Sequence, residues 1–220
     1  ARDAQGRPGR LPHFEAGDLL GIVHGEAAIP RFYSLASSSA DGEVEICVRL
    51  MPGGLVSTAL HALRPDDRID AFVRENPTFR PSDVAPSLIL IGAGAGLGPL
   101  AGFVRANHGA RPVHLYWGGR SPASDFLYED ELARALVEKR LTSLVTAFSR
   151  DPRSSAYVQD RIAADEHALR ERIRHGAQIL VCGSRDMGRA VAATLDRIVR
   201  PLGLDLATLR AGGRYVEDIY

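Results

Sequence analysis

The second half of the chain alternates between strand-length apolar runs and stretches with helical spacing, and this alternation constrains the fold most. Four apolar runs lie in SLILIGAG, VHLYWGG, LTSLVTAFS and AQILVCGS, and a predicted helix follows each. Continuous runs rich in Val, Ile and Leu are typical of strands that are buried on both faces. Such alternation favours a parallel sheet, with ligands at the carboxyl ends of its strands. The helices are expected over residues 99–107, 125–139, 157–174 and 187–200.

The first part of the chain has shorter β-like runs that are separated by turn residues. These runs are LLGIV (19–23), RFYSLA (31–36) and VEICVRL (44–50), and they predict antiparallel strands. A short helix is expected over residues 56–63, directly after a Gly-Gly pair. Backbone N–H groups at the start of such a helix can hold an anion.

A proline-rich segment separates the two patterns. PTFRPSDVAP, residues 77–86, contains three prolines and predicts a domain junction. We therefore expect two domains, residues 1–83 and residues 84–220, and 220 residues suffice for a core in each. The opening residues 1–12, rich in Arg, Gly and Pro, are expected to be irregular.

Charge and cysteine usage exclude several classes of function. Lys and Arg number 27, as do Asp and Glu, so no overall field attracts nucleic acid. No apolar stretch approaches the roughly 20 residues of a membrane-spanning helix, so no membrane segment is expected. Cys47 and Cys182 lie far apart and the histidines lack metal-ligand spacing, so neither a disulfide framework nor a metal site is expected. This pattern fits the reducing cytoplasm.

The segment GAGAGLGPL, residues 92–100, lies between a predicted strand and a predicted helix, as a phosphate-binding loop does. Its pattern is GxGxGxxP from Gly92 to Pro99, and it departs from GxGxxG at Leu97. Glycines let the backbone approach a ligand closely, and Pro99 suits the first turn of a helix. The loop predicts a dinucleotide site, and the alternative is a tight turn without a ligand.

The segment RFYS, Arg31 to Ser34, places a cation, two aromatic rings and a hydroxyl in one short run. On a strand, Arg31 and Tyr33 project to one face and Phe32 and Ser34 to the other. An arginine fork suits a pyrophosphate, and a tyrosine ring can lie on a flat heterocycle. By itself the run fits equally well an edge strand that leads into a Ser-rich turn.

Seven motifs follow one another along the chain: RFYSLASS, GGLVS, GAGAGLGPL, AFSRD, YVQD, VCG and the terminal RYVEDIY. This order resembles the ferredoxin–NADP reductase superfamily, and within it the NADPH/FAD module of diflavin reductases of the sulfite reductase flavoprotein kind. The resemblance covers the chain from about residue 14 onward. It implies an overall β + α/β fold, in which an antiparallel FAD-binding β-barrel precedes a parallel, Rossmann-like NADP-binding α/β domain.

The resemblance also implies which residues hold FAD. Arg31 and the helix start after the Gly-Gly pair would bind the phosphates, while Tyr33 and Tyr220 would stack on the ring system. Cys47 would line the flavin through its backbone. The implied FAD set is Arg31, Phe32, Tyr33, Ser34, Cys47, Val48, Gly54, Leu55, Val56, Ser57 and Tyr220.

A second set is implied for the nicotinamide nucleotide. In AFSRD, an arginine beside a serine can take the 2′-phosphate of NADPH, whereas an acidic residue alone would favour the free ribose of NADH. The superfamily usually has Thr where this chain has Ala95, so weaker positioning of the nicotinamide is expected. Diflavin reductases commonly have Lys where this chain has Ser155. The implied set is Gly94, Ala95, Gly96, Ser149, Arg150, Tyr157 and Gln159.

Four residues are implied in catalysis: Ser34, Cys182, Asp218 and Tyr220. In the family the cysteine lies beside the nicotinamide C4, and the serine and the aspartate form a hydrogen-bonded cluster with it. The terminal aromatic residue covers the flavin and moves aside for the nicotinamide. Without the resemblance, Cys182 is more simply a packing residue and Asp218 a solvated carboxylate.

The sequence thus predicts an oxidoreductase that passes hydride from NADPH to FAD and then single electrons to a flavodoxin, an FMN domain or a haem protein. Two alternatives stay open: a nucleotide-binding regulatory module that has lost turnover, and a flavin-free nicotinamide dehydrogenase. The family's barrel has one or two strands before the stretch that resembles FEAGD. We therefore expect a barrel without its first strands, in the C-terminal portion of a longer protein that could be membrane-anchored elsewhere.

Overall fold

The computed structural model describes residue 9 and residues 11–25, 29–109 and 111–220. The opening segment predicted to be irregular, residues 1–12, lies mostly outside the described residues. The strands are β1 (Leu19–Val23), β2 (Arg31–Ser34), β3 (Asp70–Arg74), β4 (Leu88–Ala93), β5 (Val113–Gly119), β6 (Ser143–Phe148), β7 (Gln178–Gly183) and β8 (Tyr215–Ile219). The α-helices are α1 (Leu55–Ala62), α2 (Leu97–Ala106), α3 (Glu129–Val137), α4 (Val158–Ala164), α5 (Glu166–Arg174), α6 (Arg185–Val199) and α7 (Leu206–Ala211). Short 3-10 turns are η1 (Ser39–Asp41), η2 (Gly94–Gly96) and η3 (Arg200–Leu202).

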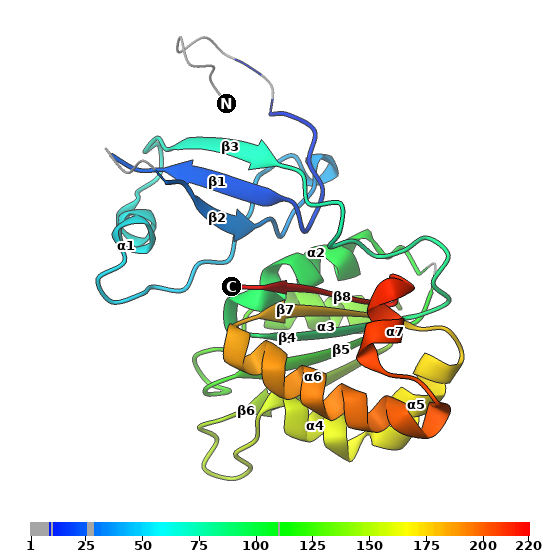
Figure 1. Cartoon of the computed structure of the whole chain (residues 1–220). Helices are drawn as coiled ribbons and strands as arrows, with labels where there is room; N and C mark the ends of the chain where they lie inside the picture. Colours follow the sequence, from blue (N-terminus) through cyan, green and yellow to red (C-terminus); the bar gives the residue numbers. More distant parts are fainter. Residues whose placement is uncertain (1–8, 10, 26–28, 110) are drawn as a thin grey trace.

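The larger sheet has five parallel strands in the order β6-β5-β4-β7-β8 (Figure 1). The four apolar runs of the second half form β4, β5, β6 and β7, which confirms the predicted parallel sheet. β8 is not among the predicted strands, because its sequence YVEDI carries two carboxylates and lacks a continuous apolar run. Its pairing with β7 holds it in the sheet and brings the C-terminus to the sheet's carboxyl edge.

Helices cover both faces of this sheet, because successive side chains of a strand point to opposite faces. Leu90 and Leu180 pack on one face with side chains of α2 and α3. Ile91 and Val181 pack on the other face with side chains of α4, α5, α6 and α7. All four side chains are completely buried, as expected for strands between two helical layers.

The predicted antiparallel part is a three-stranded sheet in the order β2-β1-β3. It packs with α1 around a small core of Phe14, Leu20, Ile22, Leu35 and Val56. The predicted β + α/β fold class is confirmed, with this sheet in the place of the FAD-binding barrel. Within the described residues the sheet is open, with β2 and β3 at its edges.

The prediction of a strand over residues 44–50 is wrong. In this described segment the structure has a single isolated bridge, between Ile46 and Leu35. The segment leaves the sheet because it packs on α2, where a Cβ added at Gly98 would lie 3.0 Å from the Cβ of Cys47. β3 occupies the free edge of β1 instead.

Two predicted helices also have different limits. The helix expected over residues 157–174 is divided into α4 and α5 at Asp165, whose carboxylate accepts a hydrogen bond from the Tyr116 hydroxyl at 3.0 Å. α3 begins later than predicted because Tyr128, directly before it, has a left-handed backbone with φ of 56°. The first deviation depends on a side chain from another element, which local spacing does not reveal.

The small sheet rests directly on α2, and Figure 1 shows it near this helix. A Cβ at Gly102 would lie 2.5 Å from both the Cβ of Ala16 and the carbonyl oxygen of Ala36, so only glycine permits this approach. The buried Gln178 amide ties the proline-rich junction to β7, accepting from the Ser82 N–H at 2.7 Å and donating to the Arg80 carbonyl at 3.2 Å. The domain boundary between residues 83 and 84 falls in this connection and stays a prediction.

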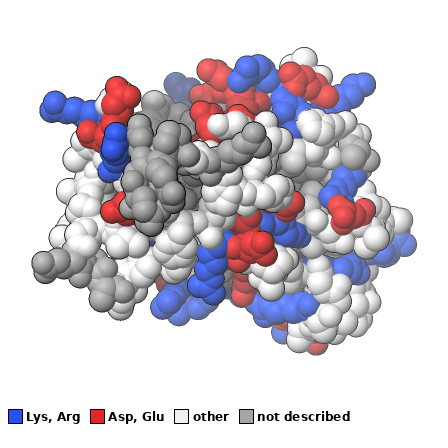
Figure 2. All heavy atoms as spheres, turned by 90° about the horizontal axis from the view of Figure 1, so that it is seen from above, with Lys and Arg blue, Asp and Glu red and all other residues white. Residues whose placement is uncertain are grey.

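The surface carries charges of both signs. Figure 2 shows Lys and Arg side chains interspersed with Asp and Glu on the face seen from above. None of the helices in the described part of the chain is long and apolar enough to cross a membrane. Among the same residues, no group of three or more His, Cys, Asp or Glu side chains could hold a metal ion.

The buried His114 makes stability depend on pH. Its Nδ1 lies 2.7 Å from the Ser143 hydroxyl, and burial, together with the charge of Arg172, lowers its pKa to about 4. The unfolded chain takes up this proton near pH 6.5 and the folded protein only near pH 4. We therefore expect the free energy of unfolding to fall by up to about 3 kcal/mol as the pH drops through this window.

Urea unfolding at a series of pH values between 7 and 4 measures this loss. His114→Gln should have a flatter profile than the unmodified protein across the window, because glutamine does not titrate. An equally steep profile in both proteins would contradict the assignment to His114.

Candidate functional site

The glycine-rich loop turns the chain from β4 into α2 at the carboxyl edge of the large sheet. A Cβ at Gly96 would lie 2.2 Å from the carbonyl oxygen of Cys182, so the loop packs directly on β7. Gly94 has φ of +54°, which favours glycine, and a Cβ there would meet nothing within 4 Å. The loop is therefore fixed on one side and open on the other, the arrangement that a phosphate or nicotinamide group requires.

Trp117 holds this loop in place, and the sequence analysis did not identify it. The side chain is completely buried, and its Nε1 donates a hydrogen bond to the Gly94 carbonyl at 3.2 Å. Its ring stacks on Phe126, with centroids 5.4 Å apart, and meets Phe148 edge-on. The available signal was the motif YWGG, which ends the strand predicted after the glycine loop.

A cleft of about 690 Å³ opens beside the loop, and residues from both parts of the fold line it. This volume is within the range of cofactor sites. One wall comes from the segment 47–49, and the others come from the loops after β4, β5, β6 and β7 and from the C-terminus. The predicted site residues that line the cleft are Cys47, Val48, Gly94, Ala95, Ser149, Tyr157, Gln159 and Tyr220.

The loops after β5 and β6 form one rim of the cleft. The backbone N–H of Arg150 donates to the Arg120 carbonyl at 2.7 Å, which joins the two loops. Arg120 lines the cleft, whereas the predicted Arg150 is exposed beside it. Arg120 was recognisable as a polar residue directly after a predicted parallel strand. The other polar lining residues not identified from sequence are Arg49, Ser124, Asp125, Ser184 and Asp186.

Three predicted residues meet where the two sheets come together. In the register of the large sheet, Cys182 lies opposite Asp218 on β8. The Ser34 hydroxyl, at the end of β2, donates a hydrogen bond to Asp218 Oδ2 at 2.5 Å. This bond joins residues 184 positions apart and links the small sheet to the large one.

Both cysteines are neutral thiols at physiological pH. Burial, followed by the charge of Asp218, raises the pKa of Cys182 well above its ordinary value, and its side chain is completely buried. Burial and the nearby charge of Glu45 raise the pKa of Cys47 to about 11. Because the thiolate is the nucleophilic form, neither residue is activated for nucleophilic attack.

Tyr220 is the last residue, yet its backbone is anchored on both sides. Its N–H donates to the Gly183 carbonyl at 3.1 Å, and its carbonyl accepts from the Arg185 N–H at 3.2 Å. The ring remains 58% exposed and lines the cleft. The C-terminal aromatic ring is therefore placed at the cleft by β8 and α6, with its face available to a ligand.

The predicted FAD residues lie on β2 and at the start of α1. The alternation along β2 is confirmed, because Tyr33 packs toward the core of the small sheet while Phe32 lies on the other face against Phe72. The Ser57 hydroxyl donates to the Gly54 carbonyl at 3.2 Å and accepts from the Met51 N–H at the same distance. These bonds fix the turn that opens α1. Gly54, Leu55 and Val56 belong to the same turn. None of the predicted residues on β2 or in this turn lines the cleft, and neither do Cys182 and Asp218.

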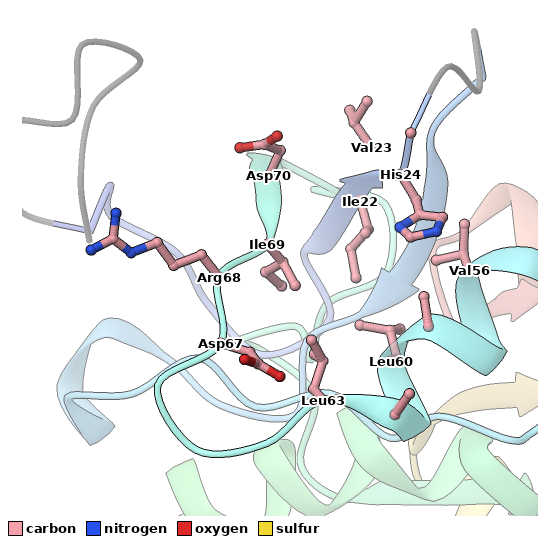
Figure 3. Close-up of a pocket in the computed structure, with 13 residues that line it drawn as sticks. Ile22, Val23, His24, Val56, Leu60, Leu63, Asp67, Arg68, Ile69 and Asp70 are labelled. Atoms are coloured by element: carbon pink, nitrogen blue, oxygen red, sulfur yellow. The ribbon is translucent and has the colours of Figure 1, made fainter.

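A second hollow, of about 390 Å³, lies between α1 and the ends of β1 and β3 (Figure 3). Its apolar lining includes Ile22, Leu60 and Ile69, while Asp67 and Asp70 lie at its rim. Among the predicted site residues in the described chain, Val56 alone lines it. It is separate from the cleft at the glycine loop, which eight of the predicted site residues line.

Two family models match the chain in tandem. Residues 14–72 match an oxidoreductase FAD-binding domain, and residues 90–193 match an oxidoreductase NAD-binding domain. The first match contains β1, β2 and α1, and the second begins in β4 and contains the glycine loop. The order of the two domains is the predicted one.

Several curated proteins are similar to nearly the whole chain. The sulfite reductase [NADPH] flavoprotein alpha-component of Cronobacter sakazakii is 32% identical over 94% of this chain, and that of Sodalis glossinidius is 35% identical over 87%. NADPH oxidoreductase A of Dictyostelium discoideum is 31% identical over 87%. The chain spans 38%, 36% and 34% of these three relatives, respectively. The chain therefore belongs to the ferredoxin–NADP reductase superfamily, with an FAD-binding domain followed by an NAD-binding domain.

Proposed function

We propose that this chain transfers hydride from NADPH to FAD and is the reductase portion of an electron-transfer protein. The observation that carries the proposal is the Ser34–Asp218 hydrogen bond, which fixes the FAD-binding sheet against the nucleotide cleft directly beside Cys182. A flavin-free dehydrogenase would have no need of this junction, and the match to an FAD-binding domain over residues 14–72 speaks against it.

The residues present fit FAD. Arg31 would hold the phosphates together with the N–H groups at the start of α1, where Ser57 fixes the turn. Tyr33 and Tyr220 would lie against the ring system, and Tyr220 offers an exposed ring for this. Cys47 and Val48 would line the ring through their backbone. Phe32, packed on Phe72, would support this strand from its outer face.

The residues present also fit NADPH. Gly94, Ala95 and Gly96 would receive the nicotinamide end, because the loop is open on the cleft side and packed against β7 on the other. Ser149, with Arg150 and Arg120 at the same rim, would receive the 2′-phosphate. Tyr157 is 61% exposed at the cleft, and its ring would stack on the adenine beside Gln159.

The chain's own residues would then orient the reactants and hold a proton. Bound flavin supplies the acceptor for hydride and can release electrons singly. The Ser34 hydroxyl, held by Asp218, would be aimed at the reacting edge of the ring, and Asp218 keeps that hydroxyl polarised. Cys182, as a neutral thiol beneath Gly96, would support the nicotinamide without reacting with it. Tyr220 would shield this edge from water until the nicotinamide displaces it.

The electrons would leave to a flavodoxin, an FMN domain or a haem protein. The support comes from the relatives, which include the NADPH flavoprotein component of a sulfite reductase and an NADPH oxidoreductase. We place the reaction in the cytoplasm, since both cysteines are free thiols and the cytoplasm keeps thiols reduced.

An anaerobic visible spectrum tests the proposal. The purified chain is loaded with FAD, freed of unbound flavin and mixed with NADPH or NADH. We expect NADPH to bleach the flavin band, and NADH to do so more slowly because it lacks the 2′-phosphate that Ser149 and the two arginines would bind. Bound flavin that stays oxidised with both nucleotides would favour a regulatory nucleotide-binding module instead.

Trp117→Phe tests the placement of the nicotinamide loop. The substitution keeps the aromatic packing but removes the hydrogen bond to the Gly94 carbonyl, so the loop loses its fixed position. We expect a weaker apparent affinity for NADPH by about tenfold, in line with the loss of one buried hydrogen bond, while FAD content is unchanged. Phe148→Leu, which removes a ring that contacts Trp117 but no hydrogen bond, is the control. Equal NADPH affinities in the two variants would contradict this role.

A further inference from the structure

Arg105, in the last turn of α2, connects three segments through one guanidinium group. Its Nε and Nη2 donate to the two carboxylate oxygens of Glu131 on α3, at 2.9 and 3.0 Å. Nη2 also donates to Glu45 at 3.2 Å, and Nη1 donates to the Ala36 carbonyl at 3.3 Å. The Arg105 side chain is 22% exposed, so these contacts are largely shielded from water. They join the nucleotide domain to the small sheet domain.

Glu45 is the point at which this network reaches the cleft. Its backbone is tied to the end of the small sheet, since its carbonyl accepts from the Ala36 N–H at 2.8 Å and its N–H donates to the Ser37 hydroxyl at 2.8 Å. Two residues later, Cys47 begins the wall that faces the glycine loop. The position of this wall therefore depends on Glu45.

The opposite wall is connected to the same arginine. Its other carboxylate partner, Glu131, lies in the first turn of α3. The segment directly before α3 contains Asp125 and Leu127, which line the cleft. Arg105 thus connects segments that lead into two walls of the cleft, one from each domain.

We propose that Arg105 and Glu45 are positioning residues for hydride transfer, because they fix the spacing between the flavin side and the nicotinamide side of the cleft. The inference rests on the proposed function and goes beyond it. Neither residue lines the cleft, so they act through the segments that lead to Cys47 and to Leu127, and they touch no cofactor. Transfer between bound groups is sensitive to small displacements, and a 1 Å error can cost about 100-fold in rate.

Arg105 is the critical residue of this network, because it is the cation that balances the carboxylates around it. Asp41, Glu45 and Glu131 all face its guanidinium group, with Asp41 at 3.8 Å. Without the arginine, three carboxylates from both domains would face one another unpaired, and their repulsion would open the contact between α2 and the small sheet. The two walls of the cleft would then move apart, while FAD and NADPH would each keep their own binding residues.

Stopped-flow reduction of the FAD-loaded chain by NADPH tests the proposal with Arg105→Gln. We expect the limiting rate of flavin reduction to fall by at least about tenfold, while FAD content and the dissociation constant for NADP⁺ change less than about twofold. Arg170→Gln is the matched control. Arg170 also pairs with a glutamate, Glu166, and bonds a backbone carbonyl, that of Ile198, with its side chain 25% exposed, but within the nucleotide domain.

An unchanged limiting rate in Arg105→Gln would overturn the proposal, as would an equal fall in Arg170→Gln. Loss of cofactor binding in step with the rate would also overturn it, since that is the result of a purely structural role. If the unmodified chain binds FAD but NADPH does not reduce it, the proposed function itself fails, and the two failures are thereby distinguished.

Glu131→Gln and Glu45→Gln provide a second route if Arg105→Gln does not fold. Each weakens one contact of the shared network and retains the arginine. Because both act through Arg105, the double variant should be no slower than the slower single variant. Rate losses that multiply in the double variant would show two independent effects and contradict a shared positioning role.

Discussion

The site depends on one hydrogen bond, from the Ser34 hydroxyl to the Asp218 carboxylate at 2.5 Å. Ser34 is the last residue of β2, an edge strand of the small sheet, and Asp218 lies on β8, the last strand of the large sheet. Neither domain can place both groups alone. The junction exists only when β2 and β8 are both in place.

Close backbone packing at glycines makes this junction possible. Gly96 lies against the backbone of Cys182, and Gly102 lies against Ala16 and the carbonyl of Ala36. The first contact brings the glycine loop onto β7, and the second brings the small sheet onto α2. The loop, Cys182 and the end of β2 consequently share one small region. The same helix, α2, contacts the small-sheet domain at two places, through Gly102 and through Arg105.

Much of the fold could be predicted because its signals are local. The apolar runs of β4 to β7 and the glycine loop are each contained within about ten residues, and the structure has them as expected. The strand predicted over residues 44–50 failed because Cys47 packs on Gly98 of another element, and β8 escaped prediction because its sequence is polar and its partner β7 stabilises it. Trp117 and Arg105 were missed for the same reason: their roles consist of contacts with residues distant in sequence. Ser34, Cys182 and Asp218 could nevertheless be predicted, because the order of the motifs along the chain resembles that of the family. No local pattern connects these three residues.

The rate of flavin reduction in Asp218→Asn tests the central claim most directly. This substitution keeps the shape of the side chain and removes the charge that holds the Ser34 hydroxyl. Glu217→Gln, the adjacent residue on β8, is the control, since Glu217 pairs with Arg210 away from the cleft. The account predicts that the FAD-loaded Asp218→Asn protein binds NADPH normally but is reduced at least about tenfold more slowly, while Glu217→Gln is reduced at the unmodified rate. Equal reduction rates in all three proteins would contradict it.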